Sequence, residues 1–289
     1  MTLQAGRIKL DPRQTIKLLV YTLLLVNFVL YIADDLSIAS YTMRDGGSLL
    51  DWTASFATTI DESAWFILLL LFELETYVLS DEIQQRVGVR ALVHGTRLLC
   101  YLSLLHSIYA FGLIYYEISQ VTVILGVTDL CQFADNGMSF VRNLAYTDLS
   151  SANCGSLSTD TQFYFTDPEL VVTDSSGLAL ETQLALADIV EVVVWMLILV
   201  TIEAMVWLQD RAITRGTIVS VIKVSKFALY GSLWIIATFW LYLGHWYFAW
   251  DEALWIVGFF AIEMNVSDWK KEIEEDLSRD SPLGVVGAE

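Results

Sequence analysis

Residues 186–208 read LADIVEVVVWMLILVTIEAMVWL, and this run decides the class of fold. It is long enough to cross a bilayer, because about 20 residues of α-helix span the hydrocarbon core. Similar apolar runs recur along the chain and predict six spans, at residues 16–34, 62–80, 96–118, 186–208, 224–244 and 251–267. We therefore expect an all-α integral membrane protein, whose sixth span is short.

The positions of the basic residues predict how these spans are oriented. Cytoplasmic loops retain Lys and Arg, whereas short translocated loops do not. All sixteen Lys and Arg except Arg44 and Arg142 fall in or beside the two termini and the second and fourth loops. We therefore expect both termini in the cytoplasm, with a bacterial inner membrane as the location. The alternative is a secretory signal cleaved near Ala39, but the first run is long for a signal and takes part in a repeat.

Internal repetition groups the spans into three predicted helical hairpins. Each even-numbered span has a Trp followed eight positions later by a Glu: Trp65 and Glu73, Trp195 and Glu203, and Trp255 and Glu263. Each odd-numbered span begins with a basic residue followed four positions later by a Tyr: Lys17 and Tyr21, Arg97 and Tyr101, and Lys226 and Tyr230.

The repeated glutamates are predicted to lie in the inner half of the membrane. Eight helical residues advance about 12 Å, so Glu73, Glu203 and Glu263 lie that far inward from their Trp. An ionised side chain there costs about 2.5–3.5 kcal/mol on insertion scales, so it is normally paired or hydrated. Two interpretations stay open: structural ion pairs with the basic residues of the odd spans, or a pseudo-threefold set of carboxylates along a cation pathway.

Acidic residues are also expected to crowd the outer face. Those at the outer ends of the even spans form a predicted acidic entrance: Asp61, Glu62, Asp188, Glu191, Asp251 and Glu252. Such a field concentrates external cations. The competing explanation is that the exclusion of Lys and Arg leaves acids there by default.

Residues 119–185 form a predicted extracytoplasmic cap with some β character. Residues 121–125, 162–166 and 170–173 are rich in β-branched and aromatic side chains, and turn-forming residues separate them. Cys131 and Cys154 are expected to form a disulfide, because they lie on the oxidising side. Cys100 is expected to be a buried free thiol. The tail, residues 268–289, is predicted to be cytoplasmic.

No motif for catalysis is found in the sequence. It has no zinc-protease, Cys-x-x-Cys, nucleophile-elbow or phosphate-loop signature, so we expect neither an enzyme nor a cofactor, and no metal site is identified. The expected partners are the lipid bilayer, cations, and a second copy or another membrane subunit, but no nucleic acid. The two functional hypotheses are a cation channel or transporter, and a membrane scaffold or sensor subunit whose cap binds a partner.

Overall fold

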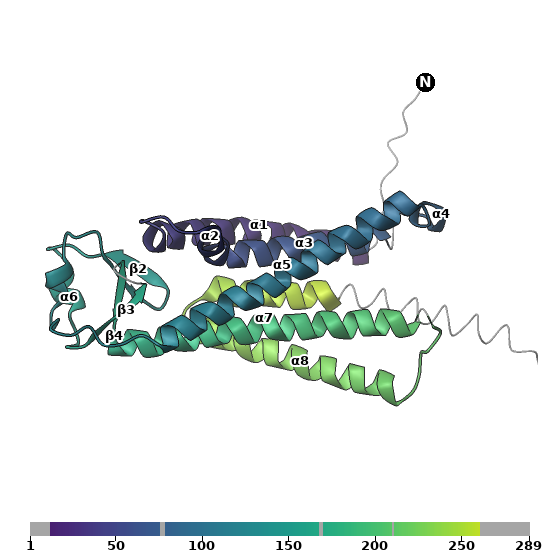
Figure 1. Ribbon diagram of the computed structural model, residues 1–289. Helices are drawn as coiled ribbons and strands as arrows, with labels where there is room; N and C mark the ends of the chain where they lie inside the picture. Colours follow the sequence, from purple (N-terminus) through teal and green to yellow (C-terminus); the bar gives the residue numbers. More distant parts are fainter. Residues whose placement is uncertain (1–11, 76–78, 168–169, 210, 261–289) are drawn as a thin grey trace, which may run out of the picture. The chain divides into compact units, whose positions relative to one another are not determined.

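The structure is a computed structural model that describes residues 12–75, 79–167, 170–209 and 211–260. Four of the described helices are long and apolar enough to cross a membrane (Figure 1). They are α1 (Pro12–Thr42), in which the candidate span is Lys17–Thr42, α5 (Val87–Ser119), α7 (Ser175–Gln209) and α8 (Thr217–Tyr242). The result supports a helical protein with several membrane-crossing segments.

The remaining predicted spans are less complete among the described residues. The second span corresponds to α2 (Leu49–Ser55) and α3 (Ala57–Glu73), which are bent by 71° and count as one candidate span together. Residues 246–260 are helical, but the rest of the predicted sixth span and the tail at 268–289 lie outside the described residues. Six spans arranged as three repeats therefore stay a prediction.

Helix α7 begins earlier than the hydropathy predicted, inside the segment expected to belong to the cap. Its first turn is capped by Asp174, whose Oδ1 accepts hydrogen bonds from the Gly177 N–H at 2.6 Å and the Ser176 hydroxyl at 2.8 Å. A carboxylate at this position satisfies amide groups that have no partner within the helix. Ser175, Ser176 and residues 181–183 are polar, so an apolar window does not detect this part of α7.

The chain divides into two compact units. Among the described residues, the cap unit falls within Phe28–Val193, and the terminal unit comprises residues 12–27, 194–209 and 211–260. In the cap unit, α3 packs along α5, and the short helix α4 (Asp81–Gln84) precedes α5. The second half of α1 joins α3 through Asp35, whose Oδ2 accepts from the backbone N–H and the hydroxyl of Thr59 at 2.9 and 2.6 Å. Asp35 thus caps a helix whose own N-cap residue, Phe56, provides no side-chain hydrogen bond.

The cap contains a small mixed sheet, with strands in the order β2–β1–β4–β3. Strands β3 (Phe163–Asp167) and β4 (Val171–Asp174) are antiparallel and confirm two of the three predicted strand segments. The third, 121–125, makes only an isolated bridge between Val123 and Tyr164 among the described residues. Strands β1 (Ser139–Arg142) and β2 (Ala145–Asp148) form an antiparallel hairpin that was not predicted.

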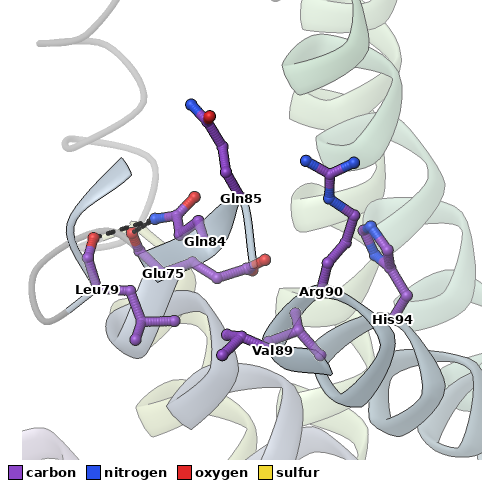
Figure 2. A pocket seen from close by; sticks show the side chains of 8 residues that line it. Glu75, Leu79, Gln84, Gln85, Val89, Arg90 and His94 are labelled. Atoms are coloured by element: carbon purple, nitrogen blue, oxygen red, sulfur yellow. Dashed lines mark hydrogen bonds between the residues drawn. The ribbon is translucent and has the colours of Figure 1, made fainter. Parts of the chain in front are cut away.

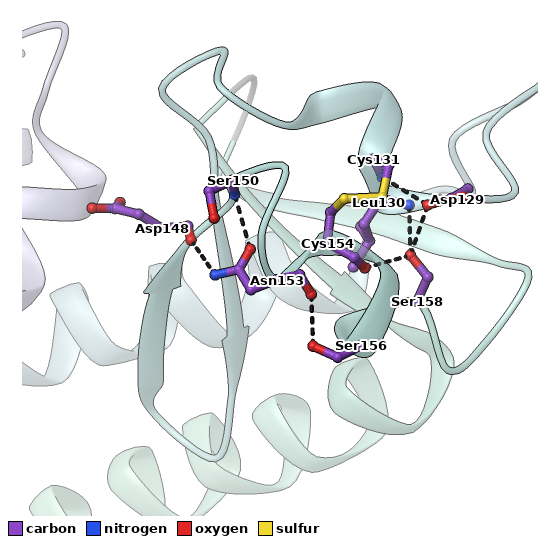
Figure 3. Close-up of a disulfide and its surroundings, with 9 residues drawn as sticks. All are labelled: Asp129, Leu130, Cys131, Asp148, Ser150, Asn153, Cys154, Ser156 and Ser158. Atoms are coloured by element: carbon purple, nitrogen blue, oxygen red, sulfur yellow. Dashed lines mark hydrogen bonds between the residues drawn. A yellow bond between two sulfur atoms is a disulfide. The ribbon is translucent and has the colours of Figure 1, made fainter.

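The interior of the cap is apolar and is closed by the predicted disulfide. Phe163 is completely buried at the centre of a cluster whose other buried members are Leu130, Met138, Phe140, Leu149, Cys154 and Val172. The disulfide between Cys131 and Cys154 joins the 3₁₀ helix η2 (Leu130–Phe133) to the short helix α6 (Cys154–Leu157) (Figure 3). Cys100 is buried and reduced, as predicted.

Three contacts attach the cap to helices of the same unit. Arg44, just after α1, donates to the carbonyl of Gly137 and to Asp148 Oδ1. Tyr41 of α1 stacks on Tyr146 of β2, with ring centroids 5.3 Å apart. On α7, the buried carboxylate of Glu181 accepts from the Leu144 N–H in the β1–β2 turn. Arg44, one of the two basic residues predicted to lie outside, thus anchors the cap.

In the terminal unit, residues 246–260 pack against the first part of α1. A Cβ added to Gly258 would lie 3.5 Å from Val20 Cγ1 and 3.8 Å from Leu24 Cδ1, which is ordinary van der Waals contact. The turn before this helix includes Gly244 with φ of +88°, a conformation that favours glycine.

Asp167 in β3 makes the stability of the cap depend on pH. Burial raises the pKa of Asp167 to about 6, and the carboxylates of Glu117 and Asp45 add to the effect. An Asp in the unfolded chain has a pKa of about 3.9. Between about pH 4 and pH 6, the Asp167 carboxyl is therefore protonated in the folded cap and ionised in the unfolded chain. We expect this contribution to be present below about pH 4 and lost as the pH rises through 6, by about 1 kcal/mol after allowing for solvent screening.

Pulse proteolysis of the cap in the full-length protein at pH 5 and pH 7 measures this effect. The cap should resist the protease better at pH 5 than at pH 7. Asp167→Asn should remove the part of this difference in resistance that is due to Asp167. The control is Asp160→Asn. The pKa of Asp160 is lowered by hydrogen bonds from Ser175 and Thr161, so its contribution is lost only as the pH falls through that lowered value. An unchanged difference in Asp167→Asn would contradict the assignment.

Candidate functional site: buried carboxylates of the apolar helices

Asp61 is half-buried on α3, one turn before the buried Trp65. Its Oδ2 accepts a hydrogen bond from Trp65 Nε1 at 3.0 Å, and its carboxylate lies within hydrogen-bonding reach of the Ser107 side chain on α5. Ser107 itself is fully buried. The repeated Trp of this span therefore contacts an acid one turn before it, towards the cap.

The buried face of α7 brings further carboxylates into the cap unit. Glu181 and Leu184 are buried, and Asp188 and Glu191, which follow at spacings of four and three residues on the same side of the helix, are half-buried. Glu191 interacts electrostatically with Asp188 on its own helix and with Asp61 on α3.

Helices α5 and α7 approach each other closely beside these groups. A Cβ added to Gly112 of α5 would lie 3.3 Å from Ile189 Cδ1 of α7, so α7 contacts α5 next to Asp188. The structure thus brings together three members of the predicted acidic entrance, Asp61, Asp188 and Glu191, between α3, α5 and α7. A fourth, Glu62, is buried with 7% of its surface exposed.

These carboxylates lie in segments without basic residues. Residues 28–42, 57–73, 98–119 and 175–193 contain no Lys or Arg. Isolated ionised carboxylates are costly in such surroundings, because both the bilayer and the packed helices solvate charge poorly. The described partners of Asp61 are neutral hydrogen-bonding groups, and its charged neighbour has the same sign.

The terminal unit contains the last two members of the predicted entrance. Asp251 and Glu252 expose 6% and 2% of their surfaces. Glu252 Oε2 accepts a hydrogen bond from Trp195 Nε1 at 3.1 Å, and the Trp195 ring lies edge-on to Tyr230 of α8 with centroids 6.5 Å apart. Trp65 and Trp195, which occupy equivalent positions in the predicted repeat, thus both donate to members of the acidic entrance.

The residues predicted for the inner half are placed less completely. Glu73 ends α3, and Glu203 lies in α7; both are half-buried, as are the six basic and Tyr residues predicted to accompany the glutamates, Lys17, Tyr21, Arg97, Tyr101, Lys226 and Tyr230. Glu263 lies outside the described residues. Arg97 forms an ion pair with Glu75, two positions beyond Glu73. The repeat spacing does not identify Glu75, because only Glu73 has an equivalent in the other hairpins.

Two further polar side chains have buried nitrogen atoms in these helices. The Nδ2 atom of Asn27 in the terminal unit and the Nε2 atom of His106 in the cap unit have no hydrogen-bond partner among the described residues. Asn27 exposes only 2% of its surface. Buried amide and imidazole groups usually have a partner, so these positions are suited to ordered water or a transient ligand. Within the described residues, no group of three or more His, Cys, Asp and Glu is placed to hold a metal ion.

Comparison with known proteins adds no family to this description. The chain matches no family model, no curated protein and no solved structure.

Proposed function

We propose that the protein moves cations across a membrane, as a channel or transporter, and that its buried carboxylates are the sites that the cation visits. One observation carries this proposal: Asp61 of α3 and Glu191 of α7 interact with each other in helical segments that contain no Lys or Arg. Two like charges in a poorly solvating environment repel each other, and uptake of a cation by either group relieves that repulsion. A proton or a small metal cation would have this effect.

The rest of the path is proposed from the sequence pattern. Glu252 and Asp251 would take up cations in the terminal unit, as we propose for Asp61 and Glu191 in the cap unit. Glu73, Glu203 and Glu263 would form the inner part of the path, with the basic residues of the odd spans beside them. The acidic outer surface would supply cations, provided that the cap faces outward.

A scaffold or sensor subunit is the second candidate, and hydrogen bonding favours it. Trp65 donates to Asp61 and Trp195 donates to Glu252, so each Trp holds a carboxylate in place. The bond between Trp195 of α7 and Glu252 would lock two helices together without any transport, and the bond between Trp65 and Asp61 would fix the carboxylate within α3. The two functions differ in whether water reaches the carboxylates.

Cysteine accessibility tests this difference. Single Cys residues replace Asp61, Glu191, Glu73 or Glu203 in a Cys100→Ala background that keeps the disulfide, and a small charged thiol reagent is applied from each side of the membrane. We expect labelling at all four positions, because a cation path must be hydrated. Leu104→Cys, buried on α5, is the unreactive control, and Leu125→Cys, in the exposed part of the cap, is the reactive control.

Protection of all four positions in folded protein would contradict the proposal and favour the scaffold. If the positions are labelled, cation flux into liposomes distinguishes a path from a closed vestibule. Asp61→Asn should lower the flux at least about tenfold, the effect of losing one good electrostatic interaction with the cation. Asp45→Asn, in an exposed loop, should leave it unchanged.

A further inference from the structure

A cavity of about 280 Å³ lies at the start of α5 in the cap unit (Figure 2). Glu75 and Leu79 line one side, and Val89, Arg90 and His94 line the side formed by α5. This cavity is separate from the carboxylates of the proposed cation path, and the inference below does not depend on that proposal.

Hydrogen bonds fix the wall opposite α5. Gln84 Nε2 donates to the backbone carbonyls of Glu75 and Leu79 at 2.7 and 3.1 Å, which ties α4 to both of these residues (Figure 2). Glu75 is neutralised by its ion pair with Arg97. The negative charge of Glu75 is therefore balanced by Arg97, which does not line the cavity.

The basic groups on the α5 side remain available. Arg90 and His94 are one helical turn apart, and Figure 2 shows their side chains next to each other. Both are exposed, and neither side chain forms a hydrogen bond or ion pair with a described residue. Guanidinium and imidazole groups at this spacing suit one oxyanion, and Arg binds phosphate oxygens with two parallel N–H donors.

The length of α5 places this cavity at the level of lipid headgroups. Its 33 residues rise about 50 Å, whereas the hydrocarbon core is about 30 Å thick. Residues 98–119 suffice to cross that core and contain no Lys or Arg. The first two turns of α5 therefore extend beyond the hydrocarbon, next to the phosphates of the leaflet.

We propose that this cavity binds the phosphate of an anionic phospholipid headgroup. Arg90 and His94 hold the phosphate oxygens, and Val89 and Leu79 contact the carbon atoms of the glycerol backbone. Anionic lipids gather beside basic residues at membrane surfaces, and basic pockets next to spans are suited to their headgroups.

Native mass spectrometry of the delipidated full-length protein tests this site, with phosphatidylglycerol as the probe. Arg90→Gln is expected to weaken binding at least about tenfold, because a hydrogen-bonded charge pair is lost. The matched control is Arg86→Gln: Arg86 precedes the same helix and is exposed, but it does not line the cavity. Diacylglycerol with the same chains should not bind, because it lacks the phosphate.

Three results would overturn the proposal. Equal weakening by Arg86→Gln would mean that general surface charge attracts the lipid. Binding of diacylglycerol as tight as that of phosphatidylglycerol would mean that the chains alone are recognised. Displacement of the lipid by millimolar inorganic phosphate would mean that the cavity serves a soluble anion. Size-exclusion profiles and thermal unfolding of each variant establish that it is folded.

Discussion

Phe163→Ala is expected to lower the free energy of unfolding of the cap by about 3–5 kcal/mol. Phe163 is fully buried where β3 crosses the apolar cluster, and Val172 and Phe140 lie in the same cluster. Removing the ring loses its transfer free energy and leaves a cavity that the surrounding sheet fills only in part. A small cap has little other apolar surface with which to compensate, so we expect it to open locally while the membrane helices stay folded.

Pulse proteolysis of the full-length protein in detergent measures this loss, since the cleavage sites opened by unfolding of the cap lie outside the membrane helices. Leu125→Ala is the matched control, because it truncates an apolar side chain of the cap that is 87% exposed. That change should stay within about 0.5 kcal/mol of the wild type. Equal protease resistance of the two variants would show that the cluster around Phe163 is not the core of the cap.

Replacing Cys131 and Cys154 together by Ser is expected to destabilise the cap by about 3 kcal/mol. The two residues are 23 positions apart, and their bond removes conformational freedom from the unfolded chain. Local hydrogen bonds remain after the substitution. The Ser158 hydroxyl donates to Asp129 Oδ1, and the Leu130 N–H donates to Ser158 Oγ, as Figure 3 shows. These bonds form only in the folded cap, so they do not restrict the unfolded chain as the disulfide does.

Reductant provides the internal control for this prediction. In wild-type protein, dithiothreitol should lower protease resistance of the cap to the level of the double Ser variant, and it should have no effect on that variant. Cys100→Ser should respond to reductant as the wild type does, because Cys100 is a free thiol in α5. A wild-type cap that keeps its full resistance after complete reduction would contradict the expected contribution.

The cap shows how far local sequence patterns reach. Strands β3 and β4 were predicted from β-branched and aromatic side chains, and the disulfide from the only two cysteines of the segment. The β1–β2 hairpin was missed because its turn residues, Asn143 and Leu144, both adopt positive φ without the glycine that marks such turns. That turn is held by a hydrogen bond from the Leu144 N–H to Glu181, which is distant in the sequence.

The candidate site shows the same division. The repeat spacing identified Trp65 and Trp195, and the sequence also identified the acidic residues of the predicted entrance. No spacing rule predicted that Trp195 would donate a hydrogen bond to Glu252 on another helix. The pairing of Arg97 with Glu75 was likewise not predicted, because side-chain reach and helix rotation decide it.

The sequence by itself determined which segments of the described chain are long apolar helices, because hydropathy and helix length are local properties that the bilayer thickness converts into spans. It also determined the disulfide. Only the tertiary structure decided how the four strands pair and which carboxylates of different helices interact. Those features depend on contacts between residues far apart in the chain. Each such contact contributes only a small free energy, and no single stretch of sequence contains both of its partners. Asp61 of α3 and Glu191 of α7 interact because α3 packs along α5 and α7 contacts α5 at Gly112, and neither residue's neighbours in the sequence encode that arrangement.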